Sequence, residues 1–310
     1  MLKNRADIRP LAHVVAWYGF LAFAWPLPLG WWTALCVAGM CLLSFLCAVI
    51  THNAIHVPLF TNRKMNLLFQ VALTLCYGHP VSAYVPGHNL SHHRYTQTRR
   101  DVMRTTKLRF RWNLLNQLLF LPGVATSIIR ADSAFARAMY KQRPRWFRQF
   151  CVEWAVFLAM NGALLAIDWQ RFVLLVFIPH NYAAWGIVGM NFAQHDGCDP
   201  NHPYNHSRTF TGRLVNWITF NNGFHGIHHT HPNLHFSEAR AAHDREVAPF
   251  IHPNLQQPNM LVWIWESFFY PGVRLKYDGT PLVLPEEGPD EDWVSAAPDD
   301  AELGQIGAAG

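Results

Sequence analysis

The sequence is poor in charge and lacks the motifs on which disulfide-rich folds and soluble metal sites depend. Charged residues make up only 15% of the 310 residues, against about 25% in an average globular chain. The six cysteines include no Cys-x-x-Cys pair, which argues against a disulfide framework or a zinc ribbon. No Glu-x-x-His motif occurs in the chain, so the carboxylate-rich metal pair of soluble four-helix bundles is excluded as well.

Long uncharged stretches indicate membrane-spanning hairpins. No Asp, Glu, Lys or Arg occurs over residues 10–62, and one span needs about 20 apolar residues. We therefore predict two spans over roughly 11–25 and 31–51. A second pair is predicted over roughly 151–167 and 172–193. No convincing cleavage site follows the charged start, which we interpret as part of an anchor.

The charge distribution predicts the orientation. Residues 57–150 hold fifteen Lys and Arg but only two acids, Asp101 and Asp132. Because basic loops face the cytoplasm, we place this segment and both termini on the cytoplasmic side of a multi-pass protein, in a bacterial cytoplasmic membrane. The uncharged stretch 65–87 is long enough to cross, but it is broken by glycine and proline. We interpret it as a re-entrant or interfacial helix.

These features predict an all-α integral membrane protein with four transmembrane helices and a cytosolic helical cap. The expected segments are an N-terminal hairpin, a cytosolic or interfacial segment, a second hairpin, the cap and an acidic disordered tail. In that order they cover residues 1–51, 52–150, 151–193, 194–278 and 279–310.

Histidine is frequent, with 18 residues, and half of them fall into short groups. The nine clustered histidines are His52, His56, His88, His92, His93, His195, His225, His228 and His229. Residues three or four apart lie on one face of a helix. We therefore expect His88 to share a face with His92, and His225 with His228 and His229. Asn191 stands four residues before His195 and is expected beside it.

All of these groups fall at the same membrane face under the predicted topology. One structural or catalytic zinc takes about four ligands, so nine imidazoles suit two metal ions. Imidazole binds iron, zinc, copper and nickel alike, so the ligand type leaves the metal open. A metal pair beside an apolar, membrane-bound cavity favours oxygen activation on a hydrocarbon over hydrolysis.

The other histidines carry less weight. We interpret His13, His79 and His252 as structural or exposed side chains. Five more crowd the predicted cap and are interpreted as orienting or structural residues rather than ligands. These five are His202, His206, His231, His235 and His243.

The spacing of the histidine groups resembles that of the membrane fatty acid desaturases and their hydroxylase relatives. The resemblance covers residues 52–243, and the family's three histidine boxes correspond to the groups that begin at His52, His88 and His225. The Asn-x-x-x-His that ends at His195 resembles the element that adds a ninth histidine and an asparagine. The resemblance implies that the nine clustered histidines and Asn191 hold two iron ions.

The same resemblance implies O2 as co-substrate and a lipid or acyl chain as substrate in the membrane. The sequence has no His-Pro-Gly-Gly haem motif, so no cytochrome b5 domain is fused to it. The electron donor is then expected to be a separate ferredoxin or cytochrome b5 with its reductase. No nucleic-acid partner is expected.

Three functions remain open from the sequence. The first is a desaturase that inserts a double bond into a fatty acyl or similar long apolar chain, with O2 and two external electrons. A hydroxylase, ketolase or alkane-type monooxygenase would share every ligand. A metal-ion transporter would place its ligands near the bilayer midplane, whereas here we expect them at the span ends and in the cap.

Overall fold

The computed structural model describes residues 1–293, 298 and 303. Among residues 1–293 the chain forms two compact units. Unit 1 contains residues 1–86 and 134–187, and unit 2 contains residues 87–133 and 188–293. Two long helices, α6 and α9, continue from one unit into the other.

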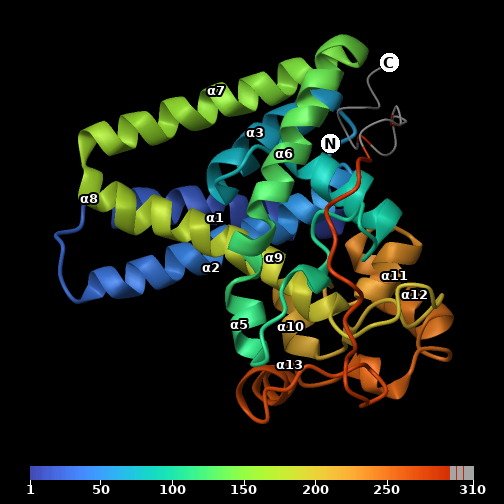
Figure 1. The fold of residues 1–310 in the computed structure, drawn as a ribbon. Helices are drawn as coiled ribbons and strands as arrows, with labels where there is room; N and C mark the ends of the chain where they lie inside the picture. The colour runs from blue at the N-terminus through green and yellow to red at the C-terminus, as the bar shows by residue number, and fades with distance from the viewer. Residues whose placement is uncertain (294–297, 299–302, 304–310) are drawn as a thin grey trace. The chain divides into compact units, whose positions relative to one another are not determined.

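Unit 1 is made of helices. Its elements are η1 (Arg5–Asp7), α1 (Ile8–Ala24), α2 (Trp32–His56), α3 (Arg63–Tyr77), α4 (Val81–Val85), the end of α6 (Phe120–Gln142), α7 (Pro144–Ile167), α8 (Trp169–Phe172), η4 (Val173–Phe177) and the first part of α9 (Ile178–His195). Figure 1 shows α7 turning back through α8 into α9. The turn is short because the Asp168 carboxylate accepts hydrogen bonds from the backbone N–H groups of Gln170 and Arg171, and so caps α8.

Polar contacts between apolar helices fix the N-terminal part of unit 1. The Trp17 indole N–H donates to Ser44 Oγ at 2.8 Å, and the Tyr18 hydroxyl donates to the Ala72 carbonyl at 2.9 Å. Trp17 is fully buried. These bonds join α1 to α2 and α3, because a buried donor without a partner would cost about 1–3 kcal/mol.

Four helices are long and apolar enough to cross a membrane, by length and composition among the described residues. They are Trp32–His56, Asn113–Gln142, Pro144–Ile167 and Trp169–His195. Three correspond to predicted spans, and each extends beyond the predicted bounds. The first predicted span is the 17-residue helix α1, which is not among these four.

The fourth candidate lies where we expected a cytosolic or interfacial segment. It combines α5 (Asn113–Leu118) with α6. Its first seventeen residues, 113–129, carry no charge, whereas its second half carries Arg130, Asp132, Arg137 and Lys141. The charge count over residues 57–150 was high because of the basic residues around this stretch, so the apolar helix was not predicted.

The stretch predicted as a re-entrant or interfacial helix is a broken helix. Its first part, α3, begins after Asn62, whose side chain accepts from the backbone N–H groups of Lys64 and Met65. It ends at Gly78, which has φ of +88°. A Cβ at Gly78 would lie 2.2 Å from the ring of His180, so glycine is required there both by conformation and by space. The short helix α4 follows Pro80.

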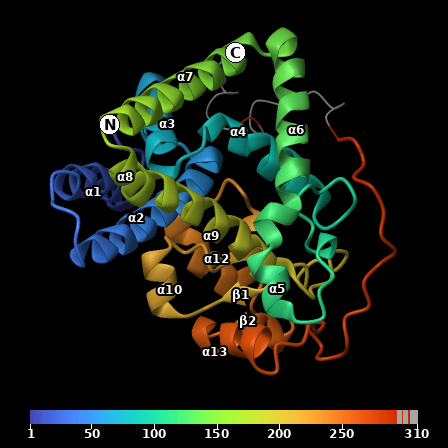
Figure 2. The same cartoon turned by 60° about the vertical axis from the view of Figure 1, so that its left-hand side comes forward.

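Unit 2 combines short helices with one pair of strands. Its elements are η2 (Pro86–His93), η3 (Thr105–Lys107), α5, the start of α6, the end of α9, β1 (Thr209–Phe210), α10 (Arg213–Ile218), α11 (His225–Thr230), η5 (Phe236–Glu238), α12 (Ala239–Glu246), η6 (Pro253–Leu255), β2 (Gln256–Gln257), α13 (Met260–Ile264) and η7 (Trp265–Phe269). Strand β1 pairs with β2 in parallel, with Thr209 opposite Gln256 (Figure 2). The expected cap is helical, apart from this pair.

An apolar core holds α11 and α12 together. It includes Phe224, Ile227, Val247, Ile251 and Leu255, all less than 9% exposed. The first of these residues directly precedes α11 and the second lies within it. The core therefore fixes the helix that carries the last three clustered histidines, because buried side chains in a close-packed interior have little freedom to move.

The described part of the expected acidic tail contacts unit 2, although most of its residues are exposed. The Asp290 carboxylate pairs with Arg104 and with Lys107 Nζ, the latter at 2.9 Å. The backbone N–H of Glu291 donates to the Arg99 carbonyl at 3.0 Å. Acids of the tail thus contact bases of residues 57–150 within unit 2.

Candidate metal centre

Four of the clustered histidines converge in unit 2. The Nε2 atom of His195 lies 3.1 Å from that of His92, 2.8 Å from that of His225 and 3.1 Å from that of His229. The Nε2 atoms of His225 and His229 are 3.1 Å apart. These four residues form a group that could hold a metal ion. Three separate stretches of the chain, η2, the end of α9 and α11, therefore supply one set of ligands.

Hydrogen-bond acceptors beside Nδ1 determine which ring nitrogen carries the proton in His92 and His195. His92 Nδ1 lies 2.9 Å from the Asp101 carboxylate, and His195 Nδ1 lies 3.0 Å from the His206 carbonyl. Both oxygens are acceptors, so each Nδ1 must carry the proton. With the proton on Nδ1, the neutral form of each ring presents an unprotonated Nε2 toward the other ring.

This arrangement fits a bound cation. Two unprotonated Nε2 atoms at 3.1 Å cannot form a hydrogen bond with each other, and their lone pairs repel. Protonating a ring would relieve the repulsion, but burial, followed by the neighbouring histidines His93 and His225, holds the pKa of His229 well below its usual value. A metal ion among the four Nε2 atoms would satisfy all of them, as neutral imidazoles do in metal sites.

Asp101 was not predicted as a site residue. It is fully buried, and its carboxylate also accepts from the backbone N–H groups of Gln97 and Met103 at 2.9 and 2.8 Å. Carboxylates of this kind orient metal-binding histidines and strengthen them as ligands. A signal for it existed in the sequence, since Asp101 is one of only two acids among fifteen bases in residues 57–150.

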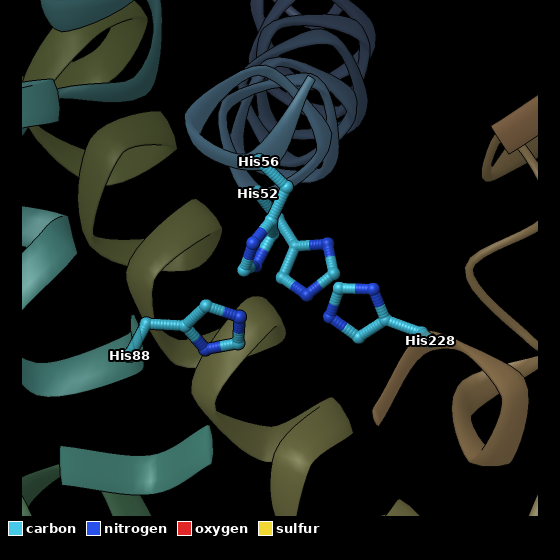
Figure 3. A group of neighbouring side chains, drawn as sticks. All are labelled: His52, His56, His88 and His228. Carbon is cyan, nitrogen blue, oxygen red and sulfur yellow. The ribbon is translucent and has the colours of Figure 1, made fainter. Parts of the chain in front are cut away.

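The remaining clustered histidines form pairs. His52 and His56 project from the last turns of α2, with ring centroids 5.7 Å apart (Figure 3). Within unit 2, the rings of His88 and His228 stack with centroids 6.0 Å apart. His93 Nε2 lies 3.0 Å from His88 Nε2.

The contacts within each histidine group agree with the helical spacing. His88 was expected to share a face with His92, and their rings stack with centroids 5.7 Å apart on the π-helix η2. His88 also lies beside His93, and His92 lies beside His195. On α11, His225 and His229 lie in the group of four, while His228 has its ring centroid 5.6 Å from that of His225 and stacks on His88.

Asn191 lies one turn before His195 and is buried. Its side-chain amide donates to the Met103 carbonyl at 3.1 Å, so it contacts the segment that carries Asp101. Its place as a metal ligand stays a prediction.

The other cap histidines make local contacts. His202 Nδ1 accepts from the backbone N–H groups of Tyr204 and Asn205, both at 3.1 Å. His231 lies 2.7 Å from Glu246, and His243 is buried against Phe224. Burial raises the pKa of the nearby Cys198 thiol to about 12, so this cysteine is a neutral thiol rather than a nucleophile.

A buried ion pair fixes the chain just after His195. Arg274 Nε donates to both Asp196 carboxylate oxygens, at 2.8 and 3.0 Å. The same guanidinium donates to the Leu108 and Thr105 carbonyls, and Arg208 donates to the Ala193 carbonyl. These bonds satisfy both buried charges and hold the end of α9, so they position the His195 ring.

Comparison with known proteins agrees with this geometry. A family model described as "Fatty acid desaturase" matches residues 26–258. The match covers more than half of the chain and includes all nine clustered histidines and Asn191. No match was found among curated proteins.

Proposed function

The chain belongs to the fatty acid desaturase family, and from that premise we propose that it inserts a double bond into a long acyl or similarly apolar chain. The reaction would use O2 and two electrons from a separate donor protein. The convergence of four imidazole Nε2 atoms in unit 2 carries the proposal, because it supplies a metal-binding site built entirely from neutral nitrogen ligands.

We assign the ligands of two iron ions to the nine clustered histidines and Asn191. One ion would take His92, His195, His225 and His229. The other would be held by the remaining five clustered histidines, as the family resemblance implies. Bound iron would supply the activation of O2 and the removal of hydrogen from an unactivated carbon. Iron rather than zinc or copper is chosen because the family uses it, since imidazole accepts all three.

The chain's own residues prepare this site in three ways. Asp101 and the His206 carbonyl hold protons on the Nδ1 atoms of His92 and His195, which keeps each Nε2 ready to bind metal. The Arg274–Asp196 pair holds the end of α9 in place. Burial of His92 and His195, each at most 1% exposed, excludes the water that would otherwise quench reactive species.

The substrate and the membrane follow from the same premise. Four apolar helices make a multi-pass membrane protein, in which a long hydrocarbon chain is soluble beside the protein. We place both termini and the histidines on the cytoplasmic side of a bacterial cytoplasmic membrane, because seven of the fifteen bases of residues 57–150 lie between Arg94 and Arg111, directly after the histidines at 88–93. A ferredoxin or cytochrome b5 with its reductase would reach the site from there.

The test is product analysis with the purified protein, iron, lipid, a ferredoxin and its reductase. We expect an alkene two hydrogens lighter than the substrate, formed only when O2 and reductant are both present. The His92→Ala variant should make none, and Asp244→Asn, an exposed substitution in unit 2, should match the parent. An alcohol or ketone as the main product would assign the chain to the hydroxylases of the same fold. Turnover without reductant would contradict both assignments.

A further inference from the structure

The acidic segment 285–291 covers a basic surface of unit 2. The basic surface is formed by Arg99, Arg100, Arg104, Lys107 and Arg109. The two lie on either side of a cavity of about 510 Å³ that is lined by four of these five bases and by residues 285–290. The covering segment is an extended trace in Figure 2.

The contacts show what chemistry this surface recognises. Its side chains bind carboxylates, since Asp290 pairs with both Arg104 and Lys107. They also bind peptide carbonyls, because Arg104 donates to Gly288 O at 3.1 Å and Arg109 to Pro285 O at 2.5 Å. A surface that combines both kinds of contact fits an acidic polypeptide better than a lipid headgroup, which offers no row of amide carbonyls.

The contact between segment 285–291 and the basic surface is strong enough to form, but weak enough for a competing protein to displace the segment. The side chains of Arg104 and Lys107 are only 9% and 10% exposed, while Asp290 is 33% exposed. The third ion pair, Arg100 with Glu291, is 3.7 Å long and about half exposed on both sides, and such pairs contribute little. A competing acidic protein needs to replace only one partly exposed carboxylate, that of Asp290, on two largely buried bases.

The position of the surface connects it to the metal ligands. Arg104 lies three residues after Asp101, and the backbone N–H of Arg104 donates to the Asp101 carbonyl at 3.2 Å. Asp101 in turn contacts His92 Nδ1. A protein bound on this surface therefore lies against the chain segment that supports a proposed iron ligand.

We propose that this basic surface docks an acidic electron-carrier protein, and that segment 285–291 is a built-in competitor which the carrier must displace. The inference rests on the proposed function for the identity of the partner as an electron carrier. Because the segment is tethered, it competes at a high effective concentration. The apparent affinity for the carrier is then reduced by the fraction of molecules in which the surface is covered.

The test measures binding of an acidic [2Fe–2S] ferredoxin to the full-length protein in detergent. One variant neutralises the covering segment: Glu286→Gln, Glu287→Gln, Asp290→Asn and Glu291→Gln. We expect it to bind ferredoxin at least about threefold more tightly than the parent at low salt, with the difference shrinking at about 1 M salt, where the screening length falls to about 3 Å. A Lys107→Gln, Arg109→Gln variant should bind at least about fivefold more weakly. The control is Arg245→Gln, an exposed base of unit 2 that is 67% exposed and pairs with Glu246; it should bind like the parent.

Unchanged or weaker ferredoxin binding by the neutralised variant would overturn the proposal. So would a tightening seen for vesicles of anionic phosphatidylglycerol but not for ferredoxin, which would identify a lipid surface instead. The experiment measures binding rather than product, so failure of the docking proposal can be distinguished from failure of the proposed function. A chain that makes no alkene but binds ferredoxin as expected contradicts the proposed function alone.

Discussion

Replacing Asp101 with Asn tests how the protein controls its metal ligands. In the parent, one Asp101 oxygen faces both His92 Nδ1 and the Gln97 N–H, and the other accepts from the Met103 N–H. Asparagine keeps one oxygen and replaces the other with an NH2 group, which can only donate. If the oxygen stays on Met103, the amide donates to His92 Nδ1, and the His92 proton must move to Nε2, the atom that faces His195.

The Asp101→Asn substitution is expected to lower the affinity for one of the two metal ions. A protonated Nε2 cannot bind metal, and changes to the partners of metal-binding histidines cost about 10- to 100-fold in metal affinity, or about 1.4–2.7 kcal/mol. The Gln97 N–H also loses its acceptor, which should lower the free energy of unfolding by about 1–3 kcal/mol. We expect Asp101→Asn to lose one of two iron equivalents at a chelator concentration that leaves the parent loaded.

The assay is iron content by elemental analysis after a chelator titration, together with thermal unfolding. Asp244→Asn makes the same chemical change on the exposed face of α12 and should retain both equivalents. Parental iron affinity in both Asp101→Asn and Asp101→Leu would refute the tautomer argument, since leucine leaves no proton acceptor at His92 Nδ1 whichever way the side chain turns.

Three further predictions follow from the same features. Alanine at any one of the nine clustered histidines should remove nearly all activity in the product assay, while His13→Ala and His252→Ala should keep most of it; two or more fully active variants among the nine would contradict the ligand assignment. A cysteine placed between Pro26 and Leu29 should react with an impermeant thiol reagent from outside, and both termini only from the cytoplasmic side; the reverse labelling would contradict the proposed orientation. Burial lowers the pKa of His243, so below about pH 6.5 the unfolded state binds more protons at this residue. Its contribution to the free energy of unfolding should therefore fall with falling pH, by up to about 1.4 kcal/mol per pH unit. The unfolding temperature should change less between about pH 7 and pH 5 in His243→Leu than in the parent. An equal change in both proteins would exclude His243 as a source of the pH dependence.

The sequence predicted well those features that depend on composition over many residues. Helix α2 is uncharged along all 25 residues, and α7 joins the helical run that begins with α8 through a turn at Asp168. Both features could be predicted because long apolar stretches are separated by a short polar turn. The helical stretch Asn113–Gln142 has an uncharged first half and a charged second half. Counting the charges over the whole of residues 57–150 averaged the two halves, so this candidate span was not predicted.

The sequence predicted which histidines gather, but not all of the contacts among them, because some depend on the type of helix and others join distant segments. The spacing of His88 and His92 predicted a shared face, and their rings stack. The π-helix η2 also brings the i+5 residue His93 to 3.0 Å from His88, measured between the two Nε2 atoms. Neither hydrophobic periodicity nor residue preference distinguishes an α-helix from a π-helix over eight residues. The contacts of His92 with Asp101 and His195 join residues that are 9 and 103 positions apart in the chain, and the spacing within one helix carries no information about contacts at that separation.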